Sequence, residues 1–397
     1  KDFAELESGS KTSWNELISL ANADLTDPAN YQRLQGNKPD GTPDPALEDY
    51  LDVDNLIDYM IQHIHGGAED WPDHNYWAAR RQGPSSTGFH FITWDQEISN
   101  DSLVRTHTRV PNRFEDPINR HGPSYLYGKL MVNETFKWTF IDRVHKHLFN
   151  GGLLTPQNNR ARWARIQATL DKAIVAESAR WGDVRRTPPY TREQDWLKEM
   201  AFMQDKDGYW DKIHPIVIQR FRNVGLYPNI EAPRLAQHGG KFEDGFTLAM
   251  SQPSANGTLH YTLDGSDPRQ PGGAPSPSAR TYTGPVALEG NLVTINARIL
   301  DGGNWSALTQ AQFHRKTIVD AASTLAVSAL NYNPFKPLPG ELADNPQLTA
   351  SDFEFIELTN TGTDEIDLEG IRFGEGAPFD TFTFPPGQKL APAGRLL

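Results

Sequence analysis

A change in sequence texture near residue 229 constrains the fold of this 397-residue chain more than any other feature. Before it, apolar residues recur every three or four positions, as they do in amphipathic helices. After it, short apolar runs alternate with clusters of turn-forming residues, which is typical of all-β structure. A chain of this length has room for two or three domains. We therefore predict domains at residues 1–228, 229–316 and 317–397.

Helix ends can be predicted within the first domain. Apolar spacing predicts helices at residues 53–64 and 136–149, which stop at Gly66-Gly67 and at Asn150-Gly151-Gly152. Three further helix starts are predicted from capping patterns and proline: Ser13 to Glu16, Thr191 to Gln194, and Pro215. The Pro/Gly-containing stretch GLYPNIEAP, at the change of texture, is predicted to be an exposed linker open to proteolysis, as is the connector at 315–323.

Composition excludes several classes of protein. The chain has no cysteine, so disulfides and thiolate metal sites are excluded. Its formal net charge of −13 argues against a uniformly basic nucleic-acid surface. No apolar stretch approaches the roughly 18 residues of a membrane helix. Because the chain starts without Met and stops inside a predicted strand, we expect it to be a fragment at both ends.

Polar side chains with possible chemistry are concentrated between residues 69 and 97. Asp70 and Asn75 lie in a loop after a predicted helix, and Asp95 and Glu97 follow a β-like run. Phosphoryl transfer needs a carboxylate that orients the acceptor hydroxyl, and an amide and a second carboxylate that hold Mg²⁺. Protein kinases place these groups in the same order along the chain. The order is compatible with a phosphoryl-transfer site, but on spacing alone we favour a simple turn around a proline, because Asp and Asn five residues apart recur by chance in an acidic chain.

Other interpretations of the polar residues are weaker. The run from Asp95 to Asp101 resembles a calcium loop but lacks the glycine at its sixth position. His63, His65 and His74 suggest zinc, yet the first two point to different sides of one helix. The cations of residues 160–186 could receive an acidic substrate. We favour a solvated helix face, with an apolar stripe turned inward at Trp163, Ile166, Leu170, Ile174 and Trp181.

The stretches LIDYMIQHIHGGAEDWPDHNYWAARR, GFHFITWDQEIS and YLYGKLMVNETFKWTFIDRVHKHLFNGG resemble the CotH (spore-coat H) kinase family. The resemblance implies an atypical kinase whose C-terminal lobe carries an Asp…Asn catalytic loop and a Trp-Asp metal motif. By this resemblance Asp70 is the catalytic base, Asn75 and Asp95 bind metal and nucleotide, and Glu97 is a further metal ligand, in place of the family's more common Asp. The implied cofactors are ATP and Mg²⁺ or Mn²⁺, and the implied substrate is Ser or Thr of a protein. We expect the N-terminal lobe of such a kinase to precede Lys1, and this chain alone to be inactive.

The two later segments also resemble known modules. HYTLDGSDPR and ARILDGGNWS are similar to the C-terminal module of chitobiases and β-hexosaminidases, and FEFIELTNTGTDEIDLEGIRF to the bacterial lamin-tail domain. The expected fold is thus multidomain: a mainly helical, α+β kinase-like C-terminal lobe followed by two all-β Ig-like sandwich modules, the last one truncated. Both resemblances imply an extracellular or cell-surface location, with attachment to glycans or other partners through the β modules. The alternative is a non-catalytic surface protein with a degenerate kinase lobe.

Overall fold

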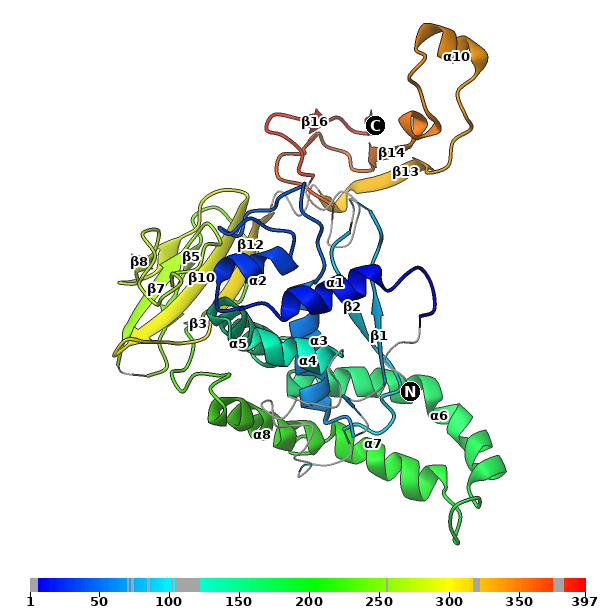
Figure 1. The fold of residues 1–397 in the computed structure, drawn as a ribbon, viewed down its shortest axis with the longest axis vertical. Coiled ribbons are helices and arrows are strands. Elements are labelled where there is room, and N and C mark those ends of the chain that lie inside the picture. Colours follow the sequence, from blue (N-terminus) through cyan, green and yellow to red (C-terminus); the bar gives the residue numbers. More distant parts are fainter. Residues whose placement is uncertain are drawn as a thin grey trace.

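The computed structural model describes residues 6–69, 71–72, 75–83, 86–100, 103, 122–254, 256–316, 322–373 and 382–397. Its first half is mainly helical and its second half is β-rich, with several separate sheets (Figure 1). This confirms the predicted change of structure along the chain. None of the helices in the described ranges combines the length and apolar character that a membrane crossing needs.

The helical half surrounds one apolar core. Its α-helices are α1 (Thr12–Ala21), α2 (Pro28–Leu34), α3 (Val53–Gly66), α4 (Pro123–Leu130), α5 (Glu134–Leu148), α6 (Pro156–Trp181), α7 (Leu197–Gln204) and α8 (Tyr209–Asn223). Helix α3 lies at the centre, with buried side chains along most of its length. The Asp52 carboxylate accepts a hydrogen bond from the Asn55 N–H at 2.8 Å and starts α3, and Gly67 ends it in the left-handed conformation. The predicted start and stop of this helix are therefore confirmed.

Two of the three expected helix starts differ from the structure. Ser13 does not cap α1, because the helix begins at Thr12 and the Ser13 hydroxyl accepts a hydrogen bond from Arg80 at 3.0 Å. Pro215 lies inside α8, whose start at Tyr209 is favoured because the aromatic side chains there are buried. By contrast, the Thr191 hydroxyl does accept a hydrogen bond from the Gln194 N–H, at 3.1 Å, and starts a short π-helical turn, η1 (Arg192–Trp196), that continues into α7.

The apolar stripe predicted to face inward on α6 is largely exposed. Ile166, Leu170 and Trp181 are all more than one third accessible to solvent. The reason is a rotation of the helix: Gln167 and Asp171, one position along from the stripe residues, form the hydrogen bonds to α7 and η1.

A small hairpin follows the central helix. Strands β1 (Tyr76–Ala79) and β2 (His90–Thr93) pair antiparallel, with Tyr76 opposite Thr93. Phe91 is buried against the core, and its N–H donates to the side-chain oxygen of Asn55 on α3 at 2.6 Å. The hairpin is thus held on α3 and is part of the helical domain.

The middle segment forms a twisted sheet around a second core. The strands are β3 (Arg234–Leu235), β4 (Gly240–Phe242), β5 (Thr247–Leu248), β6 (Met250–Ser251), β7 (Thr258–Thr262), β8 (Arg280–Thr281), β9 (Val286–Ala287), β10 (Leu292–Asp301), β11 (Asn304–Trp305) and β12 (Thr309–Arg315). The main sheet has the order β4-β12-β10-β7-β8, and β5 pairs with β9 apart from it. Ile295, Ala297 and Ile299 of the long strand β10 are completely buried.

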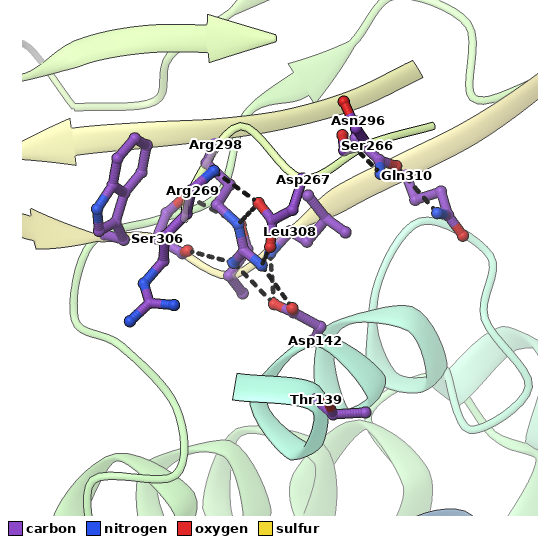
Figure 2. A network of polar contacts seen from close by, with 12 residues as sticks. Thr139, Asp142, Ser266, Asp267, Arg269, Asn296, Arg298, Ser306, Leu308 and Gln310 are labelled. Carbon is purple, nitrogen blue, oxygen red and sulfur yellow. Dashed lines mark hydrogen bonds and ion pairs between the residues drawn. The ribbon is translucent and has the colours of Figure 1, made fainter. Parts of the chain in front are cut away.

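The junction between the helical domain and this sheet is tight (Figure 2). Arg298 of β10 is 0% exposed, and its guanidinium lies between two carboxylates, Asp142 of α5 at 2.5 and 2.8 Å and Asp267 at 2.6 and 2.7 Å. Asp142 also accepts a hydrogen bond from the Leu308 N–H at 2.9 Å. Leu226, Tyr227 and Ala232 are buried, so the stretch GLYPNIEAP is a packed junction instead of the exposed linker that we predicted.

The last segment has a small core of its own. Its strands are β13 (Leu325–Asn331), β14 (Phe355–Asn360), β15 (Ile366–Asp367), β16 (Lys389–Leu390) and β17 (Arg395–Leu396), with a short helix α10 (Pro339–Asp344) and a 3₁₀ turn η2 (Ala350–Phe353). Strands β13, β14 and β17 form one sheet, and β15 and β16 another. Figure 1 shows α10 on an excursion away from both sheets. The Ig-like sandwich identity expected for the two β-rich segments stays a prediction.

Candidate functional site

The loop that follows α3 is anchored by aromatic packing. The Trp71 indole N–H donates to the Tyr59 hydroxyl at 2.8 Å, and the His63 ring stacks on Trp71 with 4.6 Å between the ring centres. Both partners come from α3, and all three side chains are buried. The predicted base Asp70 lies outside the described residues, but its neighbour Trp71 is held firmly against α3.

The segment that carries the predicted metal ligands Asp95 and Glu97 lies against the same loop. The Glu69 N–H donates to the Ile98 carbonyl at 2.9 Å, and the Asn100 N–H donates to the Gly66 carbonyl at 2.8 Å. These two bonds tie residues 98–100 to the residues on the N-terminal side of Asp70. The two parts of the sequence that we predicted to act together are therefore adjacent in space.

Asn75 and Asp95 flank the same end of the β1–β2 hairpin. The Asn75 side-chain N–H donates to the Asp95 carbonyl at 3.5 Å. Both residues have positive φ, 63° and 54°, a conformation that Asn and Asp tolerate better than most residues. The Asp95 and Glu97 side chains are exposed. Carboxylate and amide oxygens are the ligands that Mg²⁺ prefers, so this pair fits the predicted metal.

The outer side of the hairpin is apolar and exposed. Trp77 and Trp94 meet edge to face with 6.1 Å between ring centres, and Trp94 is 55% exposed. Ile92, opposite Trp77 in the sheet register, is also exposed. An exposed apolar surface therefore lies beside Asn75 and Asp95, and such a surface could contact an aromatic ring of a ligand.

The histidines near the loop are packing residues. His63 Nδ1 donates to the Tyr59 carbonyl at 2.8 Å, and burial lowers the pKa of His63 to about 4. His65 stacks on Trp210, on a different side of α3 from His63, and His74 lies outside the described residues. Within the described ranges, no three His, Cys, Asp or Glu residues gather as a metal site. Asp101 of the calcium-loop interpretation also lies outside those ranges.

Sequence reasoning did not find the anchoring role of Tyr59 and Trp71. The one available signal was the four-residue spacing of Tyr59 and His63, which puts both on one side of a helix. Their partner Trp71 is twelve residues after Tyr59 and across a loop, so periodicity could not show that contact. A cavity of about 430 Å³ lies elsewhere, beside the junction of α5 and the middle sheet, and Lys146, His238 and Gln310 are among its lining residues.

Comparison with protein families identifies two parts of the chain. Residues 8–206, about half of the chain, match the family model described as CotH kinase protein. Residues 247–313 match the model described as Fn3 associated. The chain therefore belongs to the CotH kinase protein family and carries an Fn3-associated β module. No match was found among curated proteins.

Proposed function

We propose that the helical domain is the catalytic lobe of a protein kinase that transfers phosphate from Mg–ATP, or Mn–ATP, to Ser or Thr of a protein. The carrying observation is the adjacency of the loop after α3, Asn75 and Asp95, in a chain of the CotH kinase family. Asp70 would orient the acceptor hydroxyl and accept its proton. Asn75 and Asp95 would hold the metal, with Glu97 assisting. A bound Mg²⁺ would neutralise charge on the nucleotide phosphates.

The β-rich segments have accessory roles in this proposal. We assign residues 229–316 to a chitobiase C-terminal type of module and residues 317–397 to a lamin-tail type, and we place the protein outside the cell or at its surface. The exposed Leu330, Tyr332 and Phe335 favour attachment to a partner or glycan through the last segment. The same residues support the second candidate, a non-catalytic surface protein with a degenerate lobe, which the following assay separates from a kinase.

Replacing the base tests the proposed function directly. Asp70→Asn preserves shape but removes the base and its charge, so phosphate transfer should fall by about 10²–10⁴-fold while nucleotide affinity changes little. The measurement is incorporation of radiolabelled phosphate by the natural full-length protein. Asp40→Asn, a change at an exposed turn carboxylate, is the matched control and should leave transfer unchanged. Equal incorporation by the Asp70→Asn variant and the parent would remove Asp70 from the mechanism.

Metal binding should depend on the carboxylates and not on the histidines. Asp95→Ala removes a hard oxygen ligand and should abolish Mg²⁺ or Mn²⁺ binding in a calorimetric titration. His63→Ala should leave metal binding intact, because the His63 ring is buried against Trp71. The reverse pattern would show that the metal lies at the histidines.

A further inference from the structure

Helix α6 has two unlike sides. Its 26 residues include one buried residue, Asn159. One side faces η1 and α7: Asp171 accepts two hydrogen bonds from Arg192, at 2.7 and 3.0 Å, and Gln167 accepts one from Gln204. The opposite side is exposed over its whole length, and α6 and α7 lie well away from the β-rich segments in Figure 1.

The exposed side carries a row of cations. Arg165, Lys172 and Arg180 are seven and eight residues apart, which places them on one side of the helix at intervals of roughly 10 to 12 Å. Each of the three has an alanine four positions before it: Ala161, Ala168 and Ala176. The other exposed side chains near the row include Ile166, Leu170, Val175, Glu177 and Trp181.

Unlike Arg160 and Arg186, these three cations have no acidic partner among the described residues. Arg160 pairs with Asp211, and Arg186 pairs with Asp195. Among the residues that the structure describes, neither Arg165 nor Lys172 makes a side-chain hydrogen bond or an ion pair, and Arg180 makes only a stacking contact with the adjacent Trp181. Such a row is unusual in a chain with net charge −13, where carboxylates outnumber cations.

The row begins close to the candidate site. Trp163 packs on Trp210 with 6.3 Å between ring centres, and Trp210 stacks on His65 at 5.8 Å. His65 lies in the last turn of α3, which leads into the loop of Asp70. Two layers of aromatic side chains thus separate the start of the cationic row from the catalytic loop.

We propose that the exposed side of α6 docks an acidic segment of a protein partner on Arg165, Lys172 and Arg180. An extended chain advances about 3.3 Å per residue, so intervals of 10 to 12 Å span three to four residues, and side chains four positions apart also point to the same side. A lipid surface fits less well, because a membrane-bound helix buries large apolar side chains between its cations. Here an alanine precedes each cation by four positions, and the large exposed side chains Ile166, Leu170 and Trp181 lie to one side of the row and not between its cations. If the proposed kinase function holds, the acidic segment belongs to the phosphate acceptor, but docking itself does not depend on that function.

The test is a binding titration with the 397-residue chain. The probes are labelled 16-residue peptides with Glu at every third or every fourth position, and matched peptides with Gln in place of Glu. The triple variant Arg165→Gln/Lys172→Gln/Arg180→Gln should bind the Glu peptides about tenfold more weakly, since each exposed charge pair contributes little and three act together. Affinity of the parent chain should fall with added salt.

A second triple variant is the matched control. Lys38→Gln/Lys137→Gln/Lys336→Gln removes the same number of exposed charges from other elements and should bind like the parent. If both variants bind the Glu peptides equally weakly, the loss of affinity is explained by net charge alone and the proposal is wrong. The absence of any Glu-dependent binding by the parent chain would also overturn it. Binding of the parent, but not the α6 variant, to phosphatidylserine vesicles without peptide binding would assign the row to a lipid surface instead. Because these assays need no ATP, their outcome is independent of the kinase test.

Discussion

The two β-rich segments look alike in sequence but are held in different ways. Ala307 of the Fn3-associated module belongs to the core of the helical lobe, and Arg298 joins the same module to Asp142 of α5. The small core of the last segment, in contrast, consists only of its own residues: Ile366, Leu368, Ile371, Phe384 and Leu390. Alternating apolar and turn-forming residues therefore predict strands. They do not indicate whether a β module packs against the neighbouring domain or has a separate core.

The largest effect should come from breaking the junction at Arg298. Arg298→Met leaves the carboxylates of Asp142 and Asp267 without their cation, which should lower the free energy of unfolding by about 3–5 kcal/mol. Urea unfolding followed by tryptophan fluorescence measures this change. We expect the lobe and the Fn3-associated module to unfold together in both proteins.

Arg315→Met provides the control for that experiment. Arg315 pairs with Asp244, whose side chain is 81% exposed, so its loss should cost less than about 1 kcal/mol. If the two substitutions have equal effects, the junction is no more important than a surface pair.

Acid should weaken the junction and spare the last segment. Burial lowers the pKa of His145 to about 3, and its ring makes a 2.7 Å hydrogen bond to the Tyr227 hydroxyl at the junction. The unfolded chain binds a proton near pH 6.5 and the folded chain does not, so stability falls as pH drops from 6.5 toward 3. The slope is about 1.4 kcal/mol per pH unit for each such histidine, and His63 should add to it down to about pH 4.

Urea midpoints measured between pH 7 and pH 4.5 check this slope. His145→Asn should flatten it, whatever its cost at pH 7. Residues 322–397 contain no histidine, so their unfolding should not respond in this window. A slope unchanged by His145→Asn would contradict the assignment.

The smallest change in stability should follow substitution in the last segment. Phe335 is 97% exposed, so Tyr332→Ser/Phe335→Ser should alter the free energy of unfolding by no more than about 0.5 kcal/mol. Because both aromatic side chains are exposed, we expect chymotrypsin to cut the native protein first at Tyr332 or Phe335. The double substitution should remove that cut. Tyr227 is only 4% exposed and should resist cleavage until global unfolding. A first cut at Tyr227 would restore the exposed linker that the sequence suggested.

Sequence reasoning succeeded where the causes are local. The apolar period of α3 and the glycines that end it lie close together in the sequence, and the family resemblance of the lobe rests on continuous motifs. Sequence reasoning failed where a contact with a residue far away in the sequence determines the local structure. Arg80 engages Ser13 across 67 positions, and Arg298 reaches Asp142 across 156, so neither the missing cap nor the packed junction could be predicted.

Much of the candidate site stays a prediction for a related reason. The order of Asp70, Asn75 and Asp95 along the chain predicted their proximity, and the bonds from Glu69 and Asn75 support it. The anchoring of Trp71 by Tyr59 depends on side chains that meet across a loop, and no spacing rule contains that information.

The helix α3 has a mechanical consequence for the loop that it supports. Asp58 of α3 binds Arg143 and His147 of α5, and α5 in turn binds Arg298 of the Fn3-associated module. Helix α3 is thus linked through α5 to the Fn3-associated module, and the same helix carries Tyr59 and His63, which hold Trp71. A pull on the C-terminal end of the chain should first unfold the last segment, whose core is small, and Trp71 should stay packed on α3 until the Arg298 junction breaks.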